Sequence, residues 1–436
     1  MASNTDLKEA ELWIDRGDEF LKKDDYNKAI ECYTRALDHN SRSSTAYFKR
    51  GSVYAQIKEY SKAVSDLNNA IVLNGDFSFA YFRRGSVYLD IRQFESALSD
   101  LTKAIELNPS LSFAYFKRGM VYLMLKQLDL ALDDFNHTLI LNSSYGPAYF
   151  QRANVYFAKG EYDKAIEDYN KALHYEPENI KALISRGIVL TNLKQHKAAL
   201  NDFSRVIEMD PNQAVAYNYR GMIYIKLKDY KNALKDFSKL IELDPNSYDA
   251  YNNLGVAHFS MKEYDKAAED YSNALAINPN SAQLYFNRAN CFFYLKKYNE
   301  ALADYDNALF LDPEMYLAHF GKGNVYFARE KYQDAIKEYT KAITLNPKFY
   351  NGYISRGNAF MKIRYFARAQ EDFTLAIELK PNHYLGYMNR AIAFKEDKKY
   401  EHAARDFSQF LRMVPANTKT AAQVRRWMKQ MKFPVD

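Results

Sequence analysis

The sequence predicts an all-α protein built as a linear array of antiparallel helix pairs. Three observations predict it: one pattern returns at a constant interval without insertion or deletion, a small residue stands in the middle of each first helix, and an alanine stands near the start of each second helix. Each predicted helix has a single apolar face, so one helix pair cannot form a core alone. The pairs must therefore stack on one another, and we expect the core to be a continuous ribbon.

The repeating unit is clearest in residues 149–177. Tyr149, Ala153 and Tyr156 recur at i, i+4 and i+7, which places them on one face of a first helix. A break in the pattern after this helix is followed by a second apolar face. Pro177 ends the second helix, because proline lacks the N–H that helical bonding needs.

Three anchor positions keep the same phase along the chain. The central small residue, numbered here as position 8, is Gly17, Gly51, Gly85, Gly119, Ala153, Gly187, Gly221, Gly255, Ala289, Gly323, Gly357 and Ala391. Position 20 carries Ala29, Ala63, Ala97, Ala131, Ala165, Ala199, Ala233, Ala267, Ala301, Ala335, Ala369 and Ala403. Position 32 is proline in nine repeats, and the exceptions are Ser41, Gly75 and Ser143.

These anchors resemble the tetratricopeptide repeat (TPR) family, whose period of about 34 residues equals the interval between successive anchors here. The resemblance covers residues 10–417 as twelve repeats and implies a right-handed superhelical solenoid of antiparallel helix pairs. We expect residues 1–9 to form a polar leader, and residues 418–436 to form a C-terminal capping helix and tail with Arg425, Arg426, Lys429 and Lys432 facing water. No domain boundary is expected inside the array, because no linker interrupts it.

Composition narrows the class of function. The chain has 60 basic and 54 acidic residues, a net charge of +6 that is spread over 436 residues and does not favour nucleic acid as a partner. No apolar run is long enough for a membrane span, and Cys32 and Cys291 are too far apart to suggest a disulfide framework. We therefore expect no membrane insertion and a cytoplasmic location, with the nucleus as the alternative.

Catalytic and metal-binding motifs are absent from the sequence, which contains no HExxH, GxxxxGK[ST], GxSxG or CxxC pattern. His196, His258 and His319 occupy aromatic core positions of their repeats, so we interpret them as packing residues. The sequence predicts no enzyme activity, no metal site and no cofactor.

One polar pattern recurs in the repeats. Position 7 is arginine in ten repeats and position 23 is aspartate in ten; Lys322 and Glu338 keep the two charges in the tenth repeat. We infer a ladder of Arg–carboxylate pairs between the first and second helices, because a guanidinium can hold a carboxylate with two bonds. The carboxylate could come from the same repeat or from the preceding one. The alternative is an arginine-rich groove for anionic ligands.

The first helices are the predicted binding surface. In the TPR family their residues at positions 2, 5, 9, 12 and 13 line a concave face that contacts ligands. Rings and amides recur at these positions and at position 6, a combination that suits an extended peptide, because rings take side chains and amides bond the peptide backbone. The candidate groove residues are Phe48, Phe79, Phe82, Phe113, Phe116, Phe150, Asn154, Asn253, Phe286, Asn287, Asn290, Phe320, Asn324, Asn358 and Asn389. The alternative for the position-5 phenylalanines is lateral packing between adjacent first helices.

The resemblance implies a scaffold or adaptor that binds extended segments of partner proteins in its groove. The alternative is a non-catalytic targeting subunit of an enzyme or chaperone complex. Some TPR co-chaperones hold an acidic C-terminal peptide with a two-carboxylate clamp. Here Ile354 and Gln423 stand where that clamp needs Lys and Arg, so the sequence disfavours it. The sequence does not indicate the partner or the oligomeric state.

Overall fold

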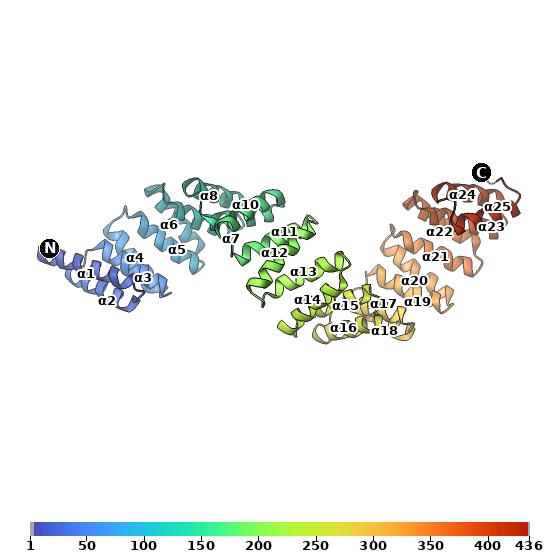
Figure 1. The fold of residues 1–436 in the computed structure, drawn as a ribbon, viewed down its shortest axis with the longest axis horizontal. Coiled ribbons are helices and arrows are strands. Elements are labelled where there is room, and N and C mark those ends of the chain that lie inside the picture. The colour runs from blue at the N-terminus through green and yellow to red at the C-terminus, as the bar shows by residue number, and fades with distance from the viewer. Residues whose placement is uncertain (1–3, 435–436) are drawn as a thin grey trace. The chain divides into compact units, whose positions relative to one another are not determined.

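The computed structural model describes residues 4–434, and within them it contains 25 α-helices and no strand (Figure 1). The chain divides into two compact units, one up to Ala216 and one from Tyr217, so that the division falls inside α13 (Ala214–Lys226). This division was not expected, because the constant interval between repeats continues through it unchanged.

The helices of both units follow the predicted register. The first unit contains α1 (Asn4–Leu21), α2 (Tyr26–His39), α3 (Ser44–Gln56), α4 (Tyr60–Leu73), α5 (Ser78–Asp90), α6 (Phe94–Leu107), α7 (Ser112–Met124), α8 (Leu128–Leu141), α9 (Gly146–Ala158), α10 (Tyr162–Tyr175), α11 (Ile180–Asn192) and α12 (His196–Met209). The second contains α14 (Tyr230–Leu243), α15 (Tyr248–Ser260), α16 (Tyr264–Ile277), α17 (Ala282–Tyr294), α18 (Tyr298–Leu311), α19 (Tyr316–Ala328), α20 (Tyr332–Leu345), α21 (Tyr350–Lys362), α22 (Phe366–Leu379), α23 (Tyr384–Glu396), α24 (Tyr400–Met413) and α25 (Lys419–Gln430).

Part of the expected polar leader is helical. Residues 4–9 are helical and belong to α1, while residues 1–3 lie outside the described part of the chain. Asp6 places a carboxylate in the first turn, where it interacts favourably with the positive end of the helix dipole. The first helix therefore begins before the first repeat does.

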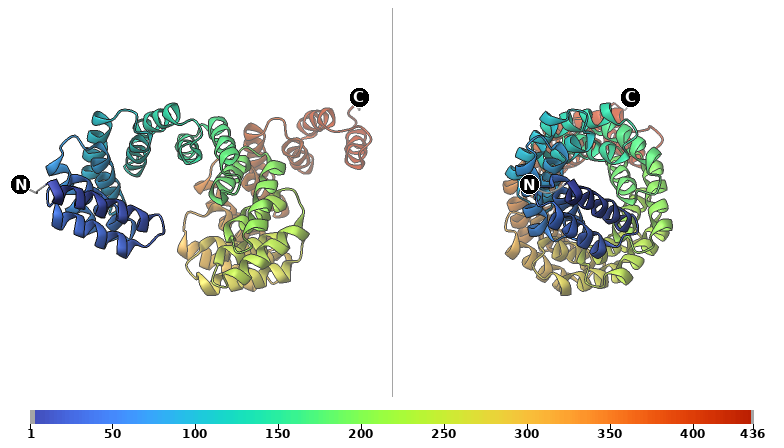
Figure 2. Two further views of the ribbon diagram at one scale, coloured as in Figure 1. Left: turned by 60° about the vertical axis from the view of Figure 1, so that its left-hand side comes forward. Right: turned by 90° about the vertical axis from the view of Figure 1, so that its left-hand side faces the viewer.

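Within each unit, second helices pack on the first helix of their own repeat and on the first helix of the next one, as α6 packs on α5 and on α7 (Figure 2). First helices also contact one another directly: α5 touches both α3 and α7, and α7 touches α9. Because these direct contacts join first helices, the first helices lie on the inner side of the local stack. That places their outward faces on the predicted concave surface.

The small residue at position 8 is required by the aromatic ring opposite it. A Cβ atom added to Gly221 would lie 2.7 Å from Cε1 of Phe237, a residue that is fully buried at position 24 of the same repeat. Where the two helices of this repeat approach most closely, the ring of Phe237 therefore packs directly against the backbone of Gly221. The spacing of small and large residues that marks the repeat is a packing requirement.

Each first helix ends in the same left-handed turn. The residue at position 15 has a positive φ, such as 64° at Lys58 and 61° at Arg92, and only Gly160 is a glycine among them. The amide of Glu59 donates to the carbonyl of Tyr54 at 2.8 Å, which closes the end of α3. The reversal of direction is therefore built from backbone hydrogen bonds that outweigh the small cost of a left-handed non-glycine residue.

The segment expected to cap the C-terminus contains α25, and residues 435–436 lie outside the described part. Met428 of α25 is buried in the core of the last repeat, where Trp427 and Met431 are partly buried beside it. Three of the four basic residues expected to face water are exposed. Arg425 is half-buried instead, and its Nη1 donates to the carbonyl of Ala416 at 2.8 Å, which ties the cap to the preceding loop.

Candidate functional site

The arginine ladder is formed within repeats. In the fourth repeat, Nε of Arg118 donates to Oδ2 of Asp134 at 2.9 Å, and Nη2 donates to Oδ1 at 2.8 Å. The same two-bond pair joins Arg50 to Asp66, Arg84 to Asp100, Arg152 to Asp168, Arg186 to Asp202, Arg220 to Asp236, Arg288 to Asp304, Arg356 to Asp372 and Arg390 to Asp406. The predicted pairs are confirmed, and the aspartate comes from the same repeat.

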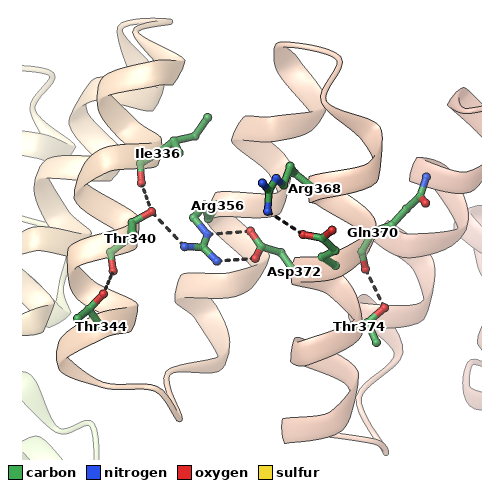
Figure 3. A network of polar contacts seen from close by, with 9 residues as sticks. Ile336, Thr340, Thr344, Arg356, Arg368, Gln370, Asp372 and Thr374 are labelled. Carbon is green, nitrogen blue, oxygen red and sulfur yellow. Dashed lines mark hydrogen bonds and ion pairs between the residues drawn. The ribbon is translucent and has the colours of Figure 1, made fainter.

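In most ladder repeats, a third hydrogen bond joins the arginine to the preceding repeat. In Figure 3, Arg356 of α21 lies between Asp372 of α22 and Thr340 of α20, and its Nη1 donates to Oγ1 of Thr340 at 3.0 Å. We did not predict this hydrogen bond between repeats from the sequence, although position 25 is Ser, Thr, Asn or Asp in all twelve repeats. Because these guanidinium groups are engaged on three helices, the ladder does not supply free cations for an anionic ligand.

Two repeats replace the ladder with a histidine–carboxylate pair, and the first of them is repeat eight. There Leu254 stands at position 7, and Nδ1 of His258 lies 2.6 Å from Oδ2 of Asp270. The interpretation of His258 as a packing residue was incomplete, because the ring also provides the polar contact that the missing arginine would have made.

In repeat ten the predicted pair between Lys322 and Glu338 is not formed. Lys322 bonds to Asp306 of the preceding repeat at 2.5 Å, while Glu338 lies 2.6 Å from Nδ1 of His319 and 3.0 Å from Lys341. Burial would raise the pKa of Glu338, but the bonds from His319 and Lys341 overcome it and lower that pKa to about 2. Lysine lacks the planar fork of donors with which an arginine at this position holds both neighbours.

The position-5 phenylalanines pack more than they face a ligand. Phe116 is only 9% exposed, and its ring centroid lies 5.9 Å from that of Phe135 and 5.1 Å from that of Tyr145. Phe116 is therefore a core residue and offers almost no surface to a partner. The other members of the set are half-buried in the same type of cluster: Phe48, Phe82, Phe150, Phe286 and Phe320.

The position-2 phenylalanines are different. Phe79 of α5 is 47% exposed and Phe113 of α7 is 45% exposed. Farther along α7, on the same face, Met124 is 56% exposed. Neighbouring first helices of the first unit therefore present large apolar side chains to solvent on the predicted concave surface.

The position-9 asparagines are largely structural. Oδ1 of Asn290 accepts a bond from the hydroxyl of Tyr305 at 2.7 Å, and Asn154 and Asn324 accept from Tyr169 and Tyr339 in the same way. The signal was present in the sequence, because in these three repeats an asparagine at position 9 coincides with a tyrosine at position 24. By contrast, the half-buried side chains of Asn358 and Asn389 form no hydrogen bond with any residue that the structure describes.

A second group of amides bonds within itself in the second unit. Nδ2 of Asn253 donates to Oδ1 of Asn218 at 2.9 Å, and Nδ2 of Asn287 donates to Oδ1 of Asn252 at 3.3 Å. Each bond joins position 5 of one first helix to position 6 of the next. These four amides therefore use part of their hydrogen-bonding capacity on one another.

Position 6 carries a cation in three successive repeats: Lys49, Arg83 and Lys117. Lys49 donates to Oδ2 of Asp18 at 2.6 Å. Neither Arg83 nor Lys117 forms an ion pair or a hydrogen bond with any described residue, and both are half-buried. No group of side chains in the described part of the chain is arranged to hold a metal ion, and no helix there is long and apolar enough to cross a membrane.

Comparison with solved structures finds helical-repeat proteins. The chain resembles yeast Tom70 at 19% identity, covering 98% of this chain and 96% of that one, with a TM-score of 0.45. It resembles the APC/C hetero-tetramer Cut9–Hcn1 at 16% identity, covering 97% and 95%, with a TM-score of 0.46. YrrB, described as a TPR protein with an unusual peptide-binding site, matches at 32% identity over 41% of this chain and 92% of its own, with a TM-score of 0.39.

None of the curated proteins matches the chain. Family models named tetratricopeptide repeat match residues 14–78, 80–111, 101–133, 146–179, 180–213, 214–247, 248–281, 282–315 and 350–383, and a model named TPR repeat matches residues 323–363. These matches agree with the helix pairs and their constant interval in both units, and the chain belongs to the tetratricopeptide repeat family.

Proposed function

We propose that the chain is a protein-interaction scaffold, and that the first helices of repeats two to five bind an extended segment of a partner protein. Membership of the tetratricopeptide repeat family supports the general role of protein binding. The site itself is supported by one observation: Phe79 of α5 and Phe113 of α7 are both about half exposed, and the two helices that carry them are in contact. Contiguous apolar surface of this kind marks interaction sites on soluble proteins.

These side chains belong to a stripe along each helix. Phe113, Lys117, Met120 and Met124 recur at i, i+4, i+7 and i+11, which keeps them on one face of α7. The equivalent stripe on α5 begins with Phe79. A segment that crosses successive first helices would meet Phe79 and then Phe113, with each ring free to cover an apolar side chain of the partner.

The test selects a displayed library of random peptides against the full chain, then compares binding to variants. Peptides of about twelve residues are long enough to span four repeats, at roughly 3.3 Å per residue and about 10 Å per repeat. We expect Phe79→Ser combined with Phe113→Ser to weaken the recovered peptides about tenfold or more, as loss of interface anchors does. The melting temperature should change little, because both rings are about half exposed.

The matched control changes exposed apolar residues on second helices of the same unit. Val72 of α4 is 83% exposed and Ile140 of α8 is 77% exposed, so Val72→Ser combined with Ile140→Ser removes apolar surface away from the first helices. Recovered peptides should bind this variant as they bind the unchanged chain. Equal losses of peptide affinity in the two double variants, or no loss in the variant that changes Phe79 and Phe113, would overturn the proposed site.

A further inference from the structure

In the proposed groove, Arg83 and Lys117 are half-buried and have no ion-pair or hydrogen-bond partner among the described residues. The adjacent residues Arg83 and Arg84 show the contrast between an unpaired and a paired guanidinium. Arg84 donates to Asp100 at 2.7 Å through Nε and to Asn68 at 2.5 Å through Nη1. Its neighbour Arg83 points from another face of α5 and has no such partner among the described residues. Burial would lower the pKa of Arg84, but Asp100, through its hydrogen bond and its charge, raises that pKa above its usual value. The pKa of Arg83 is lowered, because burial outweighs the smaller opposing effect of Asp90.

The chain itself shows which group fits beside a position-6 cation. Lys49 is the position-6 residue of repeat two, and its ammonium group contacts Oδ2 of Asp18 at 2.6 Å. Asp18 lies at position 9 of the preceding repeat and also accepts a bond from the hydroxyl of Tyr33 at 2.7 Å. At this first step of the array, therefore, a carboxylate occupies the space between two successive first helices.

The next two steps lack that carboxylate. Position 9 of the preceding repeat, which supplies Asp18 to Lys49, is Ser52 for Arg83 and Ser86 for Lys117. The hydroxyl oxygen of Ser52 is buried and has no hydrogen-bond partner among the described residues. Ser86 uses its hydroxyl on the carbonyl of Phe82 at 2.8 Å. Both steps combine an unpaired cation with a small neutral side chain where repeat one has an aspartate.

We propose that the partner segment is acidic, and that its Asp or Glu carboxylates bind beside Arg83 and Lys117 as Asp18 binds beside Lys49. This inference rests on the proposed function of the same groove and specifies the chemistry of the partner. Successive first helices lie about 10 Å apart and an extended chain advances roughly 3.3 Å per residue, so the two acidic residues are spaced about three apart. Apolar residues of the segment lie between them, over Phe79 and Phe113.

A protein segment fits these two steps better than a nucleic acid does. Binding to a phosphate backbone depends on many basic contacts, whereas the stripes of α5 and α7 offer Arg83 and Lys117 beside Asp90 and large apolar side chains. Leaving a half-buried cation unpaired is unfavourable, and a carboxylate that reaches it gains a charge-assisted bond. Alternating acidic and apolar side chains satisfy both kinds of surface at once.

The experiment selects two displayed peptide libraries against the full chain. The libraries are identical except that Asn and Gln replace Asp and Glu in the second. We expect binders to come from the first library, with acidic residues enriched about three positions apart. Arg83→Gln combined with Lys117→Gln should weaken these peptides about tenfold or more in low salt, because each charge-assisted bond contributes strongly. The control, Lys62→Gln combined with Lys103→Gln, removes two exposed lysines from α4 and α6 and should change binding less than about twofold.

A reciprocal variant tests the comparison with Asp18. Ser52→Asp should give Arg83 an internal partner, so the melting temperature should rise or stay unchanged while the acidic peptides bind more weakly. Binders that show no acidic preference and ignore the Arg83→Gln and Lys117→Gln changes would overturn this inference but leave the groove intact. Failure of both libraries to yield a groove binder would overturn the proposed function as well. Tighter binding of a single-stranded RNA oligonucleotide, lost in the same double variant, would also overturn the acidic-segment proposal.

Discussion

Repeats three and four differ from repeats eight and nine on both faces of their helices. In α5 and α7 the ladder arginines are paired with aspartates, while Arg83 and Lys117 on the groove face have no partner among the described residues. In α15 and α17 the proposed groove face differs, because Asn252 and Asn287 bond to each other there. Leu254 also interrupts the ladder in repeat eight, whereas Arg288 of repeat nine keeps its pair with Asp304. In repeats three and four, the polar side chains between the helices are paired and the cations on the proposed groove face are not. In repeats eight and nine, the amides on that face are hydrogen-bonded to each other.

This difference separates positions that hold the array together from positions that are free to recognise a partner. The same repeat pattern specifies both regions, so the fold does not depend on what stands at positions 2 and 6. It does depend on positions 8, 20 and 24, where small residues and large apolar side chains are buried in both. Function in such an array is expected to follow the variable positions.

The largest expected effect comes from removing a ladder carboxylate in the first region. Asp134→Ala leaves the guanidinium of Arg118 charged, half-buried and unpaired, which costs about 3–5 kcal/mol of local stability. Asp270→Ala in repeat eight should cost about 1–3 kcal/mol, because the side chain left behind is a histidine, which does not carry the permanent charge of an arginine. Hydrogen exchange resolved by repeat measures both, since neighbouring repeats unfold semi-independently. Equal losses at the two sites would show that the histidine pair is a full replacement for the ladder.

A pH dependence should distinguish the histidine-paired repeat ten from the ladder repeats. The pKa of Glu338 is lowered to about 2 from an ordinary 4.5, so its contribution to stability is complete above pH 4.5 and is lost as the pH falls toward 2. The loss amounts to about 3 kcal/mol at most, at roughly 1.4 kcal/mol per pKa unit. The opening free energy of α20 in the unchanged chain and in Glu338→Gln should therefore converge over this window. A difference that stays constant from pH 4.5 to 2 would mean that His319 and Lys341 do not stabilise the charged form.

Sequence patterns predicted the helix pairs closely but did not separate exposed from packed residues on the first helices, for a physical reason. The helix register follows from the phase of the repeat, because small and aromatic residues at fixed spacing allow one packing only. Whether a phenylalanine is exposed depends on what packs over it: Phe113 and Phe116 lie three residues apart, yet the first is 45% exposed and the second 9%. The phase of the repeat assigned Arg84 to the ladder, and the structure confirms its bond to Asp100. Only the structure shows that its neighbour Arg83 is half-buried with no ion-pair or hydrogen-bond partner among the described residues.

A smaller effect should separate scaffold from groove within repeat nine. Asn290 was a predicted groove residue, but it accepts the bond of the Tyr305 hydroxyl, whose side chain is 1% exposed. Asn290→Ala should cost about 1–3 kcal/mol of local stability, because a buried donor is left unsatisfied. Asn358→Ala in repeat eleven is the matched control, since the residue opposite it is Phe373 and no hydroxyl is orphaned. Comparable costs for the two would contradict the structural role assigned to Asn290.

The smallest expected effect concerns the amide row itself. Asn287→Ala removes one half-buried bond to Asn252 and one to Gln283, and neutral bonds of this kind contribute about 1 kcal/mol or less in a partly solvated site. If the row only joins neighbouring helices, this variant should bind the peptides recovered with the full chain as the unchanged protein does, because those peptides are expected to engage α5 and α7. Fluorescence anisotropy with the recovered peptides measures this directly. Loss of binding would indicate that the amides bond the peptide backbone. The two regions would then be two different binding surfaces: repeats three and four would select acidic peptides, and repeats eight and nine would bind peptides irrespective of their charge.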